Sequence, residues 1–324
     1  MERAEWVEIV NYLLETVHDG PDKNHVRDFH RPIIGHLSRG EYLDAERTCR
    51  IQLESHEDSL LWTLYAMTIV PSCDGEEILK ALQTAHDLSS ELCITWNCMA
   101  YISLQLGHGF NTFFGFEASL LIHEAQTFPR KILYVLYKDR QMWDKAIEMA
   151  QGIIQVEPEK QGGWGILEEV LAELANQAQA VKIAREMTKE FPNNYLAWWN
   201  LGMINLHYED WEGVEHAARR GIQLNREDAD LFYLLGISYM RRDMMSAAIK
   251  NLKKVVKMLP ADPGSWYNLA VALAMSGKED EAETAFEQME ALDPALHQEV
   301  IDLMTHRIET GAGPEYIRRR PVRG

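Results

Sequence analysis

Three histidines near the start of this 324-residue chain form its closest group of side chains that could bind a metal ion. His25, His30 and His36 follow one another at intervals of five and six residues. Zinc enzymes of the HExxH type place two histidines one helical turn apart, on the same face of a helix. The spacing in this chain does not do so, and it favours surface or capping roles for the histidines over a metal site.

Patterns for covalent chemistry or cofactor binding are also missing from the sequence. The glycine-rich stretch from Gly162 to Gly165 opens a helical segment, far from any strand-to-helix turn that could hold a phosphate. Glu168 and Glu169 are adjacent, so on a helix their carboxylates point apart. The sequence therefore predicts no catalytic residue, no metal and no cofactor.

Composition limits the class of partner and the compartment. The formal net charge is -18, whereas a phosphate backbone is bound by clustered Lys and Arg, so we expect no nucleic acid partner. The four cysteines, Cys49, Cys73, Cys93 and Cys98, form no CxxC pair, which is typical of core residues in a reducing compartment. The sequence shows neither a leader pattern nor an apolar run long enough for a membrane span, which predicts a cytoplasmic protein.

A spacing of 34 residues organises most of the chain. Five of the nine tryptophans share one phase of this spacing: Trp62, Trp96, Trp164, Trp198 and Trp266. The same spacing links leucines from Leu133 to Leu269 and prolines from Pro158 to Pro294. A pair of helices explains the pattern, because a large residue fills the gap between them, small residues let them approach, and proline ends the second helix.

The stretch from Pro263 to Leu296 resembles a tetratricopeptide repeat. The positions that define this family are occupied by Trp266, Leu269, Ala270, Leu273, Ala282, Phe286 and Pro294. The resemblance covers residues 26–296 and is most specific from residue 127 onward. It implies an all-α fold, a right-handed superhelical solenoid of about eight helix-turn-helix repeats with N- and C-terminal capping helices.

The resemblance divides the chain into five segments. We expect an N-terminal capping helix and linker over 1–25, degenerate repeats over 26–126, regular repeats over 127–296, a C-terminal capping helix over 297–310 and a basic disordered tail over 311–324. The first helix should pack on the open end of the array. Within the degenerate repeats, Pro32 should kink or restart a helix and Pro71 should belong to a lengthened turn.

In this family the first helix of each repeat lines an inner groove, which usually binds an extended or helical peptide. The resemblance therefore implies a partner-binding groove in this chain. Its predicted lining is Asn97, Tyr101, Lys131, Val135, Trp199, Asn200, Met203, Tyr233, Ile237, Tyr267, Asn268 and Val271. The amide groups of Asn200 and Asn268 can hydrogen-bond the main chain of a partner.

A cluster of phenylalanines is a second candidate surface. Phe110, Phe113, Phe114 and Phe116 lie within seven residues, in a stretch from 93 to 129 whose only formally charged residues are two glutamates. Four such rings cannot all face one neighbour of a helix, so some should be exposed. The alternative is that adjacent repeats or a bent helix bury the whole cluster.

These features predict a non-catalytic protein-protein interaction scaffold or adaptor that binds a peptide or partner segment in the concave groove. One alternative is a structural assembly protein whose phenylalanine cluster drives self-association into a homo-oligomer. Another is a regulatory subunit of an enzyme. The arginine-rich end, residues 315–324, either docks on an acidic surface or is a loose terminus.

Overall fold

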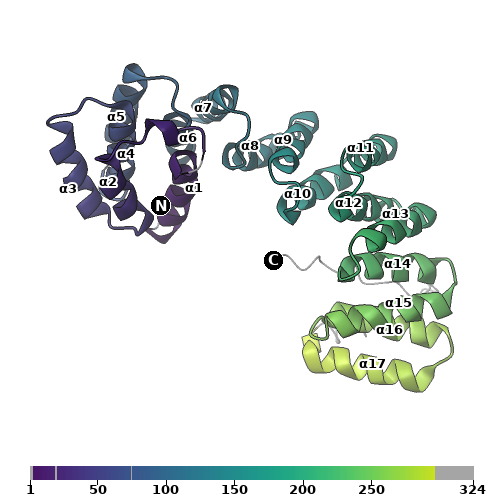
Figure 1. Cartoon of the computed structure of the whole chain (residues 1–324). Coiled ribbons are helices and arrows are strands. Elements are labelled where there is room, and N and C mark those ends of the chain that lie inside the picture. Colours follow the sequence, from purple (N-terminus) through teal and green to yellow (C-terminus); the bar gives the residue numbers. More distant parts are fainter. Residues whose placement is uncertain (1–2, 19, 74, 296–324) are drawn as a thin grey trace. The chain divides into compact units, whose positions relative to one another are not determined.

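The computed structural model describes residues 3–18, 20–73 and 75–295. This part of the chain consists of seventeen α-helices and one short 3-10 helix, without a strand (Figure 1). The predicted all-α class is confirmed. The capping helix expected over 297–310 and the basic tail expected over 311–324 lie outside the described residues.

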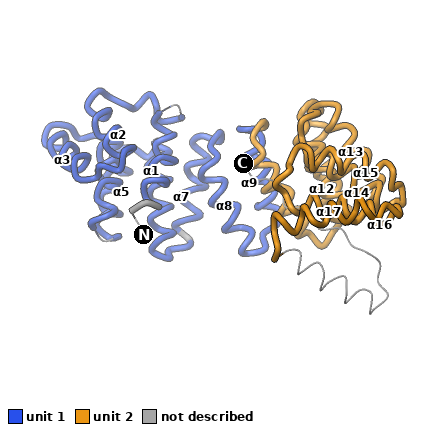
Figure 2. The backbone as a smooth tube through the Cα atoms, turned by 90° about the horizontal axis from the view of Figure 1, so that it is seen from below, with its two compact units in different colours: residues 1–157 blue, residues 158–324 orange. Residues whose placement is uncertain are grey.

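After α1 (Arg3–His18) and the 3-10 helix η1 (Lys23–His25), the helices follow in eight pairs, each with a first and a second helix. The pairs are α2 (His30–Ser38) with α3 (Tyr42–Leu53), α4 (Ser59–Ile69) with α5 (Gly75–Leu88), α6 (Cys93–Gln105) with α7 (Gly109–Ile122), α8 (Phe128–Asp139) with α9 (Trp143–Val156), α10 (Gln161–Ala172) with α11 (Gln177–Glu190), α12 (Tyr195–His207) with α13 (Trp211–Leu224), α14 (Ala229–Arg241) with α15 (Met245–Met258), and α16 (Pro263–Met275) with α17 (Glu279–Leu292). The chain forms two compact units, unit 1 over residues 1–157 and unit 2 over residues 158–324 (Figure 2).

Most pairs share one turn conformation between their two helices. A single residue in the turn has a positive φ: Gly40, Gly107, Gln141, Glu209, Asp243 or Gly277, with values from 56° to 75°. Glycine adopts this left-handed region without steric cost, while the three other side chains are mildly strained there. From residue 107 onward these positions repeat in steps of 34 or 68 residues, so the sequence period is also a backbone period.

Four tryptophans at the start of first helices make the same hydrogen bond. Each donates its ring N–H to the carbonyl oxygen of the residue six positions earlier: Trp96 to Ser90 at 2.9 Å, Trp164 to Pro158 at 2.8 Å, Trp198 to Pro192 at 3.0 Å and Trp266 to Pro260 at 2.9 Å. The bond ties each first helix to the connection that precedes it. This explains why tryptophan and proline keep a common period.

Small residues set how closely the two helices of a pair approach. A Cβ atom added to Gly236 on α14 would lie 2.8 Å from Cγ of Leu252 on α15. On α7, a Cβ atom at Gly115 would lie 2.8 Å from Cβ of Ala100 on α6. The position in α10 that corresponds to Gly236 of α14 is occupied by Glu168. The pair α10–α11 is the least closely packed of the eight.

The irregular first pair follows the sequence expectation of a restarted helix. α2 begins at His30, so Pro32 lies in its first turn and is exposed. The missing N–H of proline costs nothing there, because the first N–H groups of a helix have no partner within it.

All four cysteines belong to unit 1. Cys49, Cys93 and Cys98 are buried, and Cys73 is half-exposed. Burial raises the pKa of the Cys49 and Cys93 thiols to about 12. These thiols therefore stay protonated in the folded protein and behave as small core residues.

Candidate functional site

Helix α1 packs against α2, the first helix of the first pair, and extends across other first helices of unit 1. The ring of Trp6 stacks on Tyr101 of α6, with 6.0 Å between centroids, and its N–H donates to the carbonyl of Met67 in α4 at 3.2 Å. Farther along, Tyr12 stacks on Phe128 of α8 at 5.8 Å. Two aromatic residues thus hold α1 against three of the helices expected to line the inner groove.

The groove residues predicted in unit 1 consequently contact the chain itself or are buried. Tyr101 is 8% exposed beneath Trp6, and the ammonium group of Lys131 lies 5.7 Å from the centroid of the Tyr12 ring. Asn97 is buried and donates to the side-chain oxygen of Gln126 at 3.0 Å. Val135 differs from the others, because half of its surface is exposed at 50%.

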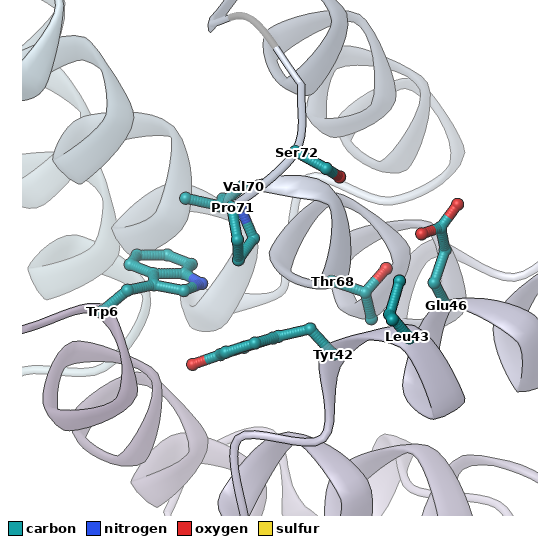
Figure 3. Close-up of a pocket in the computed structure, with 8 residues that line it drawn as sticks. All are labelled: Trp6, Tyr42, Leu43, Glu46, Thr68, Val70, Pro71 and Ser72. Carbon is teal, nitrogen blue, oxygen red and sulfur yellow. The ribbon is translucent and has the colours of Figure 1, made fainter. Parts of the chain in front are cut away.

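A cavity of about 510 Å³ lies where α1, α3 and the end of α4 meet. It is lined by Trp6, Tyr42, Leu43, Glu46, Thr68, Val70, Pro71 and Ser72 (Figure 3). The two aromatic rings border one side, and the carboxylate of Glu46, which pairs with Arg50 at 2.8 Å, borders the other. Sequence reasoning did not find this cavity, since its walls come from three segments with no shared motif.

The groove residues predicted in unit 2 lie on the consecutive first helices α12, α14 and α16. All expose 4% or less of their surface: Trp199, Asn200, Met203, Tyr233, Ile237, Tyr267, Asn268 and Val271. In the described structure these side chains therefore take part in packing. Their role in binding a partner stays a prediction.

Two polar atoms in this set have no hydrogen-bond partner among the described residues. They are the ring N–H of Trp199 and the side-chain oxygen of Asn200, both buried on α12. The amide nitrogen of Asn200 does donate, to the carbonyl of Trp164 at 3.1 Å. Buried polar atoms are nearly always paired, so the two unpaired atoms at successive positions of α12 call for an explanation.

The phenylalanines of the cluster differ in how far they are buried. Phe116 is 0% exposed and packs edge-on against Phe128, while Phe113 is half-buried with the guanidinium of Arg140 4.6 Å from its centroid. Phe114 is 56% exposed. The side chain of Phe110 is not among those described. Of the three described rings, Phe114 alone is presented to solvent.

Phe114 borders a groove of about 380 Å³ between α5 and α7, with α6 as its floor. The lining residues are Leu79, Gln83 and His86 of α5, Trp96, Met99 and Ser103 of α6, and Asn111, Phe114 and Gly115 of α7. Its walls are second helices, so it lies apart from the predicted inner groove. The rings of Trp96 and Phe114 meet edge to face at 5.5 Å.

One of the N-terminal histidines, His30, supports a helix cap. His30 is 0% exposed; its Nδ1 accepts from the backbone N–H of Arg27 at 2.9 Å, which leaves Nε2 to donate to Asp58 at 2.9 Å. Asp58 in turn caps α4 through the N–H of Leu61. Throughout the described ranges, no group of three or more His, Cys, Asp or Glu side chains is arranged to hold a metal ion.

The comparisons with known proteins agree with this repeat architecture. Residues 233–297 match the family model described as tetratricopeptide repeat. The chain contains tetratricopeptide repeats. The C-terminal part of a TPR repeat-containing protein from Cytophaga hutchinsonii superposes with a TM-score of 0.51 at 10% identity, over 83% of this chain and 96% of that one. A MamA segment from Desulfovibrio magneticus gives 0.43 at 17% identity, over 52% and 96%.

One curated relative of the repeat protein is the BBSome complex member BBS4 homolog of Drosophila melanogaster. It is 24% identical over 158 residues, which are 48% of this chain and 32% of the relative. The alignment thus spans about a third of the length of that protein. Among the helices that the structure describes, none is long and apolar enough to cross a membrane.

Proposed function

We propose that this repeat protein is a non-catalytic adaptor that binds a segment of a protein partner at the inner helices of unit 2. The observation that carries the proposal is that two successive residues of α12, Trp199 and Asn200, each have a buried polar atom without a partner among the described residues: the ring N–H and the side-chain oxygen. The main chain of a partner segment carries an acceptor and a donor at nearly every residue, so it can supply an acceptor for Trp199 and a donor for Asn200. Each such atom left unpaired costs about 1–3 kcal/mol.

Helix α1 supports the kind of partner segment that we propose. In unit 1, first helices accept a helix through aromatic anchors, with Trp6 on Tyr101 and Tyr12 on Phe128. Tetratricopeptide first helices in this chain can therefore bind an amphipathic helix, a common mode of peptide recognition. We assign Trp199, Asn200, Met203, Tyr233, Ile237, Tyr267, Asn268 and Val271 to the equivalent surface of unit 2.

The relative supports a place in a larger assembly, because it is described as a complex member. We extend this to our chain as a proposal that it is one subunit of a multiprotein complex. The four free thiols fit a reducing compartment, for which we propose the cytoplasm.

The burial of the proposed site has a consequence for binding. Side chains that expose 4% or less of their surface meet a partner only after the packing around them changes. Binding should therefore alter the environment of Trp199, which tryptophan fluorescence quenching detects.

The test compares two buried asparagines of α12. Asn205 also has an unpaired buried oxygen, but its side chain faces Gly213 at the start of α13. Proximity crosslinking in native lysate should give a partner whose crosslinks map to α12, α14 and α16 and which Asn200→Ala loses at least about tenfold. Asn205→Ala should retain it. A partner equally retained by both variants, or crosslinked elsewhere, would overturn the proposal.

A further inference from the structure

Helix α15 differs from the other second helices in the sign of its charge. Among its residues the formally charged ones are all lysines: Lys250, Lys253, Lys254 and Lys257. Each of the seven other second helices carries at least one carboxylate. The chain as a whole has a formal net charge of -18, so α15 is a local basic surface on an acidic protein.

These lysines form one exposed stripe, called here the lysine stripe. All four side chains are exposed. Their intervals of three, one and three residues place them within about 100° of one another around the helix, because each residue advances the helix by about 100°. From Lys250 to Lys257 the stripe is about 10 Å long, at a rise of about 1.5 Å per residue.

Most of the lysine stripe has no carboxylate partner in the part of the chain that the structure describes. Lys253 pairs with Glu281 of α17 at 2.6 Å. Within the described residues no ion pair involves the three others: Lys250, Lys254 and Lys257. The ammonium group of Lys254 lies 4.3 Å from the centroid of the Phe232 ring. Such a contact holds the ammonium group in place and leaves its charge uncompensated.

Helix α11 carries a lysine at the same repeat position with its charge compensated. Lys182 lies 68 residues, or two repeat periods, before Lys250. It pairs with Glu186 of the same helix at 3.9 Å. In α15 the position of Glu186 is occupied by Lys254. The charge that α11 neutralises within one helix is therefore doubled in α15, where it is available to an anionic partner.

The neighbouring helix α17 restricts the shape of such a partner. Its formally charged residues are all carboxylates, and each is exposed: Glu279, Asp280, Glu281, Glu283, Glu287 and Glu290. A flat anionic surface such as a lipid bilayer would meet these carboxylates together with the lysine stripe, and like charges repel. A narrow chain can lie along α15 alone. At physiological salt, exposed charges more than about 8 Å away are largely screened, so the acidic remainder of the protein opposes such a chain only weakly.

We propose that the lysine stripe binds an acidic peptide segment, a run of Asp or Glu residues in a partner protein. Charge complementarity and the width of the stripe support this occupant over a membrane. The length of the stripe matches about three or four residues of an extended chain, at about 3.3 Å per residue. The stripe belongs to a second helix, whereas the site proposed at Trp199 and Asn200 lies on a first helix, so the failure of one proposal leaves the other untouched.

The first test measures binding of the full chain to a fluorescein-labelled peptide of about eight glutamates by fluorescence anisotropy. The wild type should bind it, and raising NaCl from roughly 20 to 200 mM should weaken binding at least about fivefold, because salt screens exposed charges. The double variant Lys250→Glu, Lys257→Glu should weaken binding more than about tenfold. Asn200→Ala should bind as the wild type does.

The matched control is the double variant Lys182→Glu, Lys189→Glu. It makes the same change in net charge at the same repeat positions of α11, where both lysines are also exposed. It should weaken binding less than about twofold. Circular dichroism confirms that each variant is folded.

Each contrary result of this test is decisive. A wild type that does not bind the glutamate peptide would overturn the proposal, as would equal binding of a glycine–serine peptide of the same length. Equal weakening by the two double variants would show that only the net charge matters. Binding to vesicles that contain phosphatidylserine, without binding to the peptide, would assign the lysine stripe to a membrane and overturn the proposal as well.

A second test locates the bound peptide. A carbodiimide joins carboxylates to nearby lysine amines, so mass spectrometry should find the glutamate peptide attached to Lys250, Lys254 or Lys257. Lys182 and Lys189 of α11 report non-specific attachment. Attachment spread evenly over the lysines of both helices would contradict binding at the lysine stripe.

Discussion

The carboxylate of Asp22 closes the N-terminus of the helix that begins at Cys93. Its Oδ1 accepts from the N–H of Cys93 at 3.0 Å, and its Oδ2 accepts from the N–H of Ile94 at 2.7 Å. The residue directly before this helix is Leu92, which has no capping oxygen, whereas α4, α12, α14 and α16 are each capped by the Asp or Asn that precedes them. The linker after α1 supplies the missing cap and fastens α1 to α6.

Replacement of Asp22 should destabilise unit 1. Asp22→Ala removes both acceptors, and we expect the free energy of unfolding to fall by about 1–3 kcal/mol. Asp22→Asn keeps one oxygen and should cost less. Urea denaturation measures the loss, and hydrogen exchange should localise it to α1 and α6. Asp28→Ala serves as the control, since the Asp28 side chain is fully exposed and the change should stay within about 0.5 kcal/mol.

The stability of unit 1 should fall in acid because the carboxylate of Glu41 becomes protonated. Hydrogen bonds from Arg39 and then His36 lower the pKa of the Glu41 carboxyl to about 2, from 4.5. Because the folded-state pKa is depressed, this contribution is present above pH 4.5 and is lost as the pH falls toward 2. Glu41→Gln should flatten the pH dependence in that window. An unchanged acid limb in the variant would contradict the assignment.

The carboxyl group of Asp22 should make the stability of unit 1 depend on pH in the opposite sense to Glu41. Burial raises the pKa of its carboxyl above 3.8, although the N–H groups of Ile94 and Cys93 oppose the shift. A raised folded-state pKa contributes stability that is present below pH 3.8 and is lost as the pH rises through the folded value. Asp22→Asn should remove this component, and an NMR titration of the carboxyl should give a midpoint above 3.8.

The tryptophans at the start of the first helices should differ in their contribution to stability. Trp164 is 0% exposed and Trp266 is half-exposed, although both make the same hydrogen bond. We expect Trp164→Ala to cost about 3–5 kcal/mol and Trp266→Ala clearly less. Because repeats are coupled mainly to their neighbours, hydrogen-exchange protection should fall first around the substituted pair. Uniform loss along the chain would contradict this.

The phenylalanines of α7 provide a matched set on a single helix. Phe116→Ala should cost about 3–5 kcal/mol, since the ring is fully buried. Phe114→Ala should change the stability of the monomer by no more than about 0.5 kcal/mol, because the ring is largely exposed. Thermal unfolding at low protein concentration separates this effect from association. Similar losses in the two variants would contradict the packing described for α7.

The repeated helix pairs could be predicted because the contacts that define them join residues that are close in the sequence. Trp164 and Pro158 lie within or directly beside their own pair, so a fixed spacing exposes them in the sequence. The phenylalanine cluster was only partly predictable. Spacing shows that the rings diverge, but which ring is exposed depends on neighbours such as Phe128 and Arg140 in α8 and the turn that follows it.

Long-range contacts escaped sequence reasoning. Trp6 bonds to Met67 and Asp22 to Cys93, contacts that span 61 and 71 residues. No regular spacing in the sequence marks either contact. A helix before the first repeat suggests an end cap, by analogy with other repeat arrays. The predicted groove lining met a similar limit, because the family frame assigns Tyr233 and Tyr267 to the inner helices but does not determine how much of each ring is covered.

The cysteine distribution gives the protein an internal reporter of folding. A thiol-reactive probe should label half-exposed Cys73 in the native state, and should reach Cys49, Cys93 and Cys98 only when their surroundings open. Since unit 2 contains no cysteine in the sequence, pulsed labelling would follow the opening of unit 1 without any engineered tag, while unit 2 stays silent. The opening of unit 1 can thus be timed by itself in the unmodified protein.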